Sequence, residues 1–168
     1  MTVTDLRFRK RHRLRQKEVA SLAASLDGIL GTKTFSEGEV VDMAEGPGYD
    51  AVFAGGNILA FVVDGKPFLT VRGVLRFGAQ KRFVTVDMGA VKYVCNGADV
   101  MGPGIVEVDL DVKAGDLVWI RDVKNRQPLA VGKAIVDAAA MLRKEKGKAV
   151  EAVHHVGDKL WLADEKKE

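Results

Sequence analysis

The stretch that most limits how this chain can fold is residues 97–104, GADVMGPG, where three glycines and one proline fall within eight residues. This composition excludes a continuing helix or a regular strand, and it favours a tight turn that another backbone can approach closely. Before the turn, Asp87 is placed to cap a helix of about two turns. Ala90, Val91, Val94 and Cys95 form one apolar stripe on that helix. We expect Gly97 to end the helix and residues 105–108 to form a strand.

The same patterns extend through the second half of the chain. Apolar segments predict six strands, at residues 83–86, 105–108, 117–121, 128–136, 150–156 and 160–162, and the last two are expected to form a closing hairpin. Asp137 is placed to cap a second helix that runs to about Lys144. Residues 83–163 are therefore predicted to hold six strands and two helices.

The first half has one strong helix signal and several strands. Residues 16–30 repeat apolar side chains at helical spacing, and Gly31 follows them. Strands are predicted near residues 3–10, 39–44, 50–54, 58–63 and 66–69. Asp64-Gly65 predicts a type I′ hairpin turn, and Thr70 is placed to cap a short helical turn through residue 75. We place a domain boundary in the basic connector at residues 76–82, and we expect residues 164–168 to form a charged, frayed tail.

Composition limits the class of protein. The chain has 168 residues, of which 47% are hydrophobic and 29% charged, as is typical of a globular protein. No apolar run is long enough to span a bilayer, and no signal-peptide pattern opens the chain. A single cysteine, Cys95, excludes an internal disulfide, and no Cys/His cluster offers a zinc site. We expect a cytoplasmic protein with no metal, no cofactor and no membrane partner.

Positive charge is concentrated at the start of the chain. Residues 1–17 contain seven basic residues and one acidic residue, whereas the remainder contains 19 basic and 22 acidic residues. This local excess predicts a surface that faces a polyanion. The alternative is a solvated edge strand whose charges prevent aggregation. The basic N-terminal patch comprises Arg7, Arg9, Lys10, Arg11, Arg13, Arg15 and Lys17.

The segment NGADVMGPGI, between a short helix and a strand, resembles the PUA domain, a small β-barrel of RNA-modifying enzymes and free-standing RNA-binding proteins. The flanking segments FVTVDMGAVKYV and GDLVWIRDVKNRQPLAVGKAIV fit the same pattern. The first half, with its hairpin NILAFVVDGKPFLTV, and the closing VEAVHHVGDKLWLAD are similar to the MCT-1/Tma20 family (malignant T-cell amplified sequence, translation machinery-associated protein). That family includes archaeal relatives and the N-terminal part of ligatin, and the short form of this chain favours an archaeal member.

The resemblance implies an α+β fold with two parts. An N-terminal pre-PUA α/β domain would occupy residues 1–80, and a PUA pseudo-barrel of six mainly antiparallel strands and two helices would occupy residues 83–163. It also implies RNA binding in translation, on the small ribosomal subunit or on tRNA, during initiation, reinitiation or recycling. A protein partner of the density-regulated type is implied for eukaryotic members.

The sequence favours a binding protein over an enzyme. No nucleophile, base and orienting residue form a recognisable set, and no phosphate-binding glycine motif opens a helix after a strand. About 80 residues before the PUA-like part leave no room for a catalytic domain. Two alternatives stay open: an RNA-binding accessory subunit of an RNA-modification complex, of the pseudouridine synthase or tRNA-guanine transglycosylase type, and a protein-interaction scaffold.

Candidate RNA-binding residues fall into two groups. In PUA domains RNA lies across the glycine loop, where a backbone without side chains can approach phosphate and sugar. The matching residues here are Gly97, Ala98, Asp99, Val100, Met101, Gly102, Pro103 and Gly104. Basic side chains on the adjacent helix and the central hairpin are candidates to bind phosphates. They are Lys92, Arg121, Lys124, Arg126 and Lys133.

Other conspicuous residues are given structural interpretations. Phe83, Tyr93 and Trp119 lie among aliphatic neighbours and are predicted to be core, and Cys95 is predicted to be a buried thiol. His154 and His155 are adjacent on a predicted strand, so their side chains should point to opposite faces and cannot bind one metal together.

Overall fold

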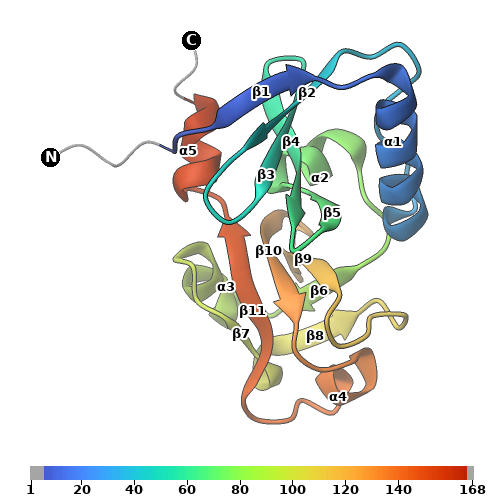
Figure 1. Cartoon of the computed structure of the whole chain (residues 1–168). Coiled ribbons are helices and arrows are strands. Elements are labelled where there is room, and N and C mark those ends of the chain that lie inside the picture. The colour runs from blue at the N-terminus through green and yellow to red at the C-terminus, as the bar shows by residue number, and fades with distance from the viewer. Residues whose placement is uncertain (1–5, 166–168) are drawn as a thin grey trace, which may run out of the picture. The chain divides into compact units, whose positions relative to one another are not determined.

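The computed structural model describes residues 6–165, which form two compact units (Figure 1). The first unit contains the described residues up to Ala79 together with those from Lys159 onward. The second unit is Gln80–Asp158. The chain therefore leaves the first unit once and returns to it at its last helix.

The first unit is an antiparallel sheet of five strands in the order β1-β2-β3-β4-β5, with helices packed on it. Helix α1 buries the apolar stripe that the sequence predicted, including Val19, Leu26 and Leu30. The elements are β1 (Arg9–Arg13), α1 (Gln16–Leu30), β2 (Val41–Glu45), β3 (Asp50–Ala54), β4 (Asn57–Val63), β5 (Lys66–Leu69), α2 (Val71–Phe77) and α5 (Lys159–Glu165).

Local signals explain the β4–α2 segment. Asp64 and Gly65 both have positive φ, 51° and 77°, which confirms the predicted type I′ turn. The Thr70 hydroxyl accepts a hydrogen bond from the Gly73 N–H at 3.1 Å and caps α2, which runs two residues longer than predicted. Gly73 lies so close to the Leu59 carbonyl that no side chain would fit there.

Two predictions for this unit are wrong. The first strand begins at Arg9, because pairing with β2 starts at Arg9 opposite Glu45; residues 6–8 are not strand, and the predicted residues 3–5 lie outside the described part. Residues 160–162 are not a strand but part of helix α5. The buried Asp164 carboxylate fixes α5 to this unit by accepting the Ile58 N–H at 2.9 Å.

The second unit is a six-stranded sheet in the order β7-β11-β10-β9-β6-β8. The pairings are antiparallel except β6 with β9, which is parallel, and the apolar core includes Val86, Ile120 and Val150. The elements are β6 (Phe83–Val86), α3 (Met88–Cys95), β7 (Val100–Met101), a 3-10 turn (Gly102–Gly104), β8 (Ile105–Val108), β9 (Leu117–Asp122), β10 (Pro128–Ala134), α4 (Ala138–Leu142) and β11 (Lys148–His155).

The predicted α+β fold, with an N-terminal sheet and a curled C-terminal sheet of mainly antiparallel strands, is confirmed. The sixth strand of the second unit is not the one predicted. It is β7, inside the glycine loop, where Val100 is paired with Val150 of β11. The expectation that residues 97–104 contain no strand is therefore wrong at Val100 and Met101, because a strand this short depends on its partner and composition alone gives no sign of it.

Candidate nucleic-acid interface

An open groove of about 460 Å³ lies between helix α3 and the glycine loop, residues 97–104. Its lining is mostly apolar, and the loop's Asp99 supplies the charged side chain among the lining residues. The lining residues are Gly89, Ala90, Tyr93, Val94, Ala98, Asp99, Val100, Met101 and Gly104. The structure thus brings five of the eight predicted loop residues into one hollow with the helix before them.

Short local contacts join the start of α3 to the end of the glycine loop beside the groove. The Asp87 carboxylate caps α3 by accepting the Ala90 N–H at 2.9 Å, and the Asp87 N–H donates to the Gly104 carbonyl at 3.0 Å. A Cβ on Gly104 would lie 3.4 Å from the Ala90 methyl group. Gly97 ends the helical segment with φ of 90°, in the left-handed region that favours glycine. The sequence pattern of cap and glycines therefore sets the shape of the groove.

Asp99 is fixed on one side of the groove by strand β11. Its carboxylate accepts the Ala152 N–H at 2.8 Å and lies 3.1 Å from the Lys148 ammonium group. The Ala152 N–H and then Lys148 lower the pKa of Asp99 below its ordinary value, against the opposing effect of burial. Asp99 is therefore a carboxylate whose charge Lys148 neutralises, and a phosphate near the groove does not meet it as a bare anion.

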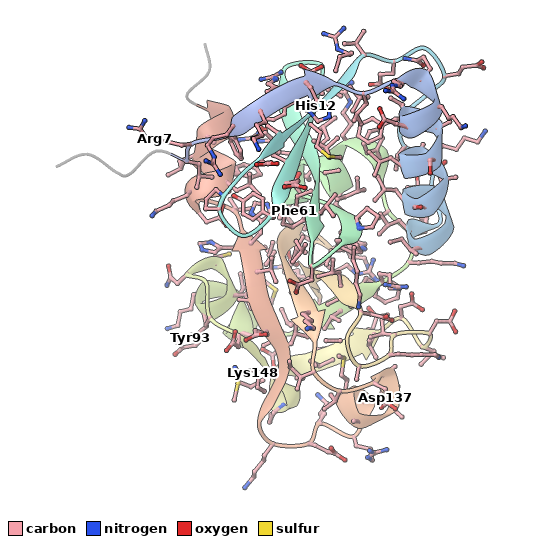
Figure 2. The ribbon with its side chains drawn as sticks, viewed as in Figure 1. Arg7, His12, Phe61, Tyr93, Asp137 and Lys148 are labelled. Atoms are coloured by element: carbon pink, nitrogen blue, oxygen red, sulfur yellow. The ribbon has the colours of Figure 1, made fainter. Side chains whose placement is uncertain are left out.

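Tyr93 was predicted to be core, and that prediction is wrong. Its side chain is 58% exposed, and Figure 2 shows it on the outer side of α3. Ala90, Val91, Val94 and Cys95 form the face of α3 that packs on the core, and Tyr93 is not on that face. The helical spacing of these residues could therefore have shown that Tyr93 points away from the core, where it lines the groove. Met101 is also exposed on the opposite wall. An aromatic ring and a thioether at the surface of a mostly apolar groove suit contact with a flat ring.

The basic candidates in the second unit are not equivalent. Lys92 is exposed on α3, with its ammonium group 5.2 Å from the centre of the Tyr93 ring. Arg121 is enclosed instead: its guanidinium lies 4.0 Å from the centre of the Phe83 ring, and its Nε donates to the Thr85 hydroxyl at 2.9 Å. Burial, followed by the charge of Arg126, lowers the pKa of Arg121. This environment gives Arg121 a packing role.

The hairpin residues lie outside the groove lining. Arg126 donates to the Glu107 carboxylate at 2.9 Å, Lys124 is exposed in the turn, and Lys133 is half-buried on β10. Pro103 and Gly102 belong to the 3-10 turn and also lie outside the lining.

The basic N-terminal patch lies on and beside edge strand β1, whose five residues are exposed. Asp42 on β2 accepts hydrogen bonds from the Nε atoms of Arg11 and Arg13 at 3.0 and 2.6 Å. Arg13, then Arg11, lowers the pKa of Asp42. Within the described part of the chain, no ion pair engages the other five members. They are Arg7, Arg9, Lys10, Arg15 and Lys17.

The histidines, the cysteine and the other aromatic residues named from the sequence are buried or half-buried. His154 is buried with Nδ1 2.9 Å from an Asp158 oxygen, whereas the half-buried His155 ring lies against Gly97. Cys95 is half-buried rather than fully buried, and burial raises the pKa of its thiol. Trp119 is buried and Phe83 is half-buried. No three His, Cys, Asp or Glu side chains among residues 6–165 are grouped to hold a metal ion.

Comparison with known proteins gives consistent matches over both units. The model of the PUA domain matches residues 82–156. The protein MJ1432 of Methanocaldococcus jannaschii is 33% identical over 158 residues, which cover 93% of this chain and 98% of that protein. Translation machinery-associated protein 20 of Saccharomyces cerevisiae is 30% identical over 112 residues, 63% of this chain and 62% of the yeast protein.

A solved structure agrees over most of the chain. The crystal structure of protein PH0734.1 from Pyrococcus horikoshii superposes with a TM-score of 0.80 at 30% identity, and the match covers 92% of this chain and 99% of that one.

Between residues 6 and 165, the helices are all too short or too polar to traverse a bilayer.

Proposed function

This chain belongs to the family of PUA-domain proteins that includes MJ1432 and the Tma20 proteins, and we propose that it is a non-enzymatic RNA-binding protein acting in translation. Its binding site for RNA would be the groove between α3 and the glycine loop. More specifically, the protein would bind the small ribosomal subunit or tRNA during initiation, reinitiation or recycling. A role on the ribosome would place the protein in the cytoplasm.

The observation that carries this proposal is the composition of the groove. Exposed Tyr93 and Met101 stand on facing walls, and the glycine backbone between them leaves phosphate and sugar free to approach. Sequence-tolerant RNA recognition combines stacking of unpaired bases on aromatic side chains with contacts to the sugar-phosphate backbone. A groove of about 460 Å³ has room for an unpaired nucleotide. The candidate loop residues 97–104 would bind RNA together, through the shape of the loop and through its backbone N–H and carbonyl groups.

The basic N-terminal patch supports a larger footprint. Its members outside the Asp42 ion pairs keep their charges available to a phosphate backbone, and the sequence-independent part of RNA affinity comes from such charges. Lys92, Lys124 and Lys133 are further candidates on the second unit. Because Arg121 is enclosed by Phe83 and Thr85, we give it no direct contact with RNA.

The yeast relative is named for its association with the translation machinery, and that name motivates the assignment to translation here. A protein partner of the density-regulated type is part of the same proposal. It would add contacts to the small subunit that this chain does not make alone.

The test is binding of labelled tRNA and of purified small ribosomal subunits at two salt concentrations. Wild type is compared with a groove variant, Tyr93→Ser/Met101→Ser, and a patch variant, Arg7→Gln/Arg9→Gln/Lys17→Gln. All five side chains are exposed, so the variants should fold.

Salt-dependent binding to small subunits that both variants weaken would support the proposal. Binding to tRNA alone would support RNA binding but exclude the small subunit as the target. No binding to either RNA would overturn the proposal in favour of a protein-interaction scaffold.

A further inference from the structure

A strongly basic loop that the sequence patterns did not single out lies directly against the glycine loop. Residues 143–148, RKEKGK, connect α4 to β11 and contain four basic residues and one acidic residue. The Gly102 N–H donates to the Gly147 carbonyl at 2.9 Å, and Gly102 packs so tightly on the Glu145 backbone that a Cβ would collide with the Glu145 carbonyl oxygen. Lys148 is the register partner of Met101, which lines the groove. We call residues 143–148 the basic loop.

The shape of the basic loop is fixed by its backbone. Lys144 takes φ of 55°, a left-handed conformation that is uncommon for a residue with a side chain, and its N–H donates to the Met141 carbonyl at 3.0 Å. Gly147 takes φ of 102°, after which the chain enters β11 beside β7 (Figure 1). Contacts at both ends of the basic loop therefore hold it in one place beside the groove.

Two of its four cations are engaged and two are not. Arg143 lies 2.7 Å from the Glu145 carboxylate within the loop, and Lys148 lies 3.1 Å from Asp99 of the groove. Figure 2 shows Lys148 at the start of β11. Lys144 and Lys146 are exposed, and no ion pair engages them within the part of the chain that the structure describes. Lys148 thus cancels the charge of Asp99, and Lys144 and Lys146 supply a net positive charge next to it.

The basic loop is more positively charged than the rest of its unit. Residues 80–158 contain 12 basic and 11 acidic residues, so the unit as a whole exerts little attraction on a polyanion. The basic loop holds a third of those basic residues in six positions. It is also joined through Gly102 to a groove suited to a nucleotide. One RNA strand can therefore contact both features without a change in the protein.

We propose that the basic loop is a second RNA contact, in which Lys144 and Lys146 bind phosphates of the nucleotides next to the one in the groove. This inference rests on the proposed function and extends the site beyond the glycine loop and the central hairpin. The ligand chemistry is the sugar-phosphate backbone of RNA, so the contact adds affinity without reading sequence. Lys144 and Lys146 act as exposed point charges on flexible stems, which suits phosphate binding.

The test measures the salt dependence of binding to a labelled tRNA transcript for four proteins. They are wild type, Lys144→Gln/Lys146→Gln, a charge-matched control Lys81→Gln/Lys113→Gln, and Tyr93→Ser/Met101→Ser. The control removes two exposed lysines of the same unit that lie outside the basic loop and the groove.

Each lost phosphate contact lowers the slope of log affinity against log salt by roughly 0.7 to 0.9. We expect the basic-loop variant to lose about 1.5 from the slope and roughly tenfold or more in affinity at 0.1 M salt. The matched control should keep the wild-type slope.

The outcomes separate this inference from the proposed function. If wild type binds and the groove variant loses binding, but the basic-loop variant keeps the slope of its control, the second contact is wrong and the groove stands. Equal loss in the control and the basic-loop variant would also overturn it, since the effect would then come from net charge alone. If wild type binds neither this tRNA nor small ribosomal subunits in the same assay, the proposed function itself falls.

Discussion

Replacement of Gly102 by alanine should destabilise the second unit, because this residue joins the glycine loop to the basic loop. An added Cβ would meet the Glu145 carbonyl oxygen far inside the 3.0 Å that real Cβ atoms keep, and the Glu145 carbonyl carbon at 3.0 Å. The obstacle is backbone, so no side-chain rotation relieves the clash. One of the two loops must move by about 1 Å or more, which opens the packing around both.

The cost can be worked from the contacts that move. Overpacking of this kind costs about 1–3 kcal/mol, and weakening the 2.9 Å bond from the Gly102 N–H to the Gly147 carbonyl adds about 1 kcal/mol. We expect a loss of about 2–4 kcal/mol in the free energy of unfolding. With a urea m-value of about 2 kcal/mol per M, the unfolding midpoint should fall by roughly 1–2 M.

The assay is urea unfolding followed by tryptophan fluorescence. The chain has two tryptophans, Trp119 in the second unit and Trp161 in the first, so a Trp161→Phe background lets Trp119 report on the second unit alone. Gly89→Ala is the matched control: it lies in α3, where the added Cβ would be 3.4 Å from the Asp87 carboxylate, and it should be neutral or stabilising by up to about 1 kcal/mol. A Gly102→Ala midpoint equal to that of Gly89→Ala would refute the close approach of the two loops.

Four further predictions concern single side chains. Asp164→Asn should cost the first unit about 3 kcal/mol, because the buried carboxylate lies 3.0 Å from the Arg72 guanidinium. Trp161 fluorescence during urea unfolding, in a Trp119→Phe background, measures this cost, and an unchanged midpoint would contradict it. A carbon-13 NMR titration should place the pKa of Asp99 below the ordinary value, so that its stabilising contribution is present above about pH 4 and is lost as the pH falls. Lys148→Met should raise that pKa only part of the way, since the backbone N–H from β11 is the larger cause; full return to the ordinary value would show otherwise. Iodoacetamide should alkylate Cys95 at pH 8 more slowly than a free thiol, because burial raises its pKa, and a rate equal to that of glutathione would count against this.

The elements that could be predicted from sequence are those whose signals are local. Helix α1 follows from apolar spacing, the turn at residues 64–65 from Asp-Gly, and the caps of α2 and α3 from Thr70 and Asp87. Each signal acts within a few residues, so distant parts of the chain hardly alter it. The tight turn at residues 97–104 was predictable for the same reason, whereas the groove between it and α3 was not.

Helix α5 shows why other elements could not be predicted. Leu160-Trp161-Leu162 is a short apolar run of the kind that a buried strand contains, yet residues 159–165 form a helix. Its Asp164 accepts the N–H of Ile58, a partner 106 positions earlier in the chain. Contacts of such sequence separation leave no local pattern, and tertiary context overrides weak local preference. Strand β7 is the same case, because two residues become a strand only when β11 lies beside them.

The candidate site shows a related limit, which concerns charge. The sequence patterns singled out Arg11, Arg13 and Arg121 and passed over Lys146, yet the first two arginines share Asp42 and the third is enclosed by aromatic rings. An arginine beside a carboxylate keeps other N–H donors, but its charge is partly offset, and an enclosed arginine would have to leave its packing contacts to reach a phosphate. A free lysine in a fixed loop has no such contact to lose. The neighbours of each cation therefore set how available it is to a phosphate, and on this argument Lys144 and Lys146 of the basic loop outrank Arg121 of the central hairpin, whereas the exposed Lys124 stays a candidate.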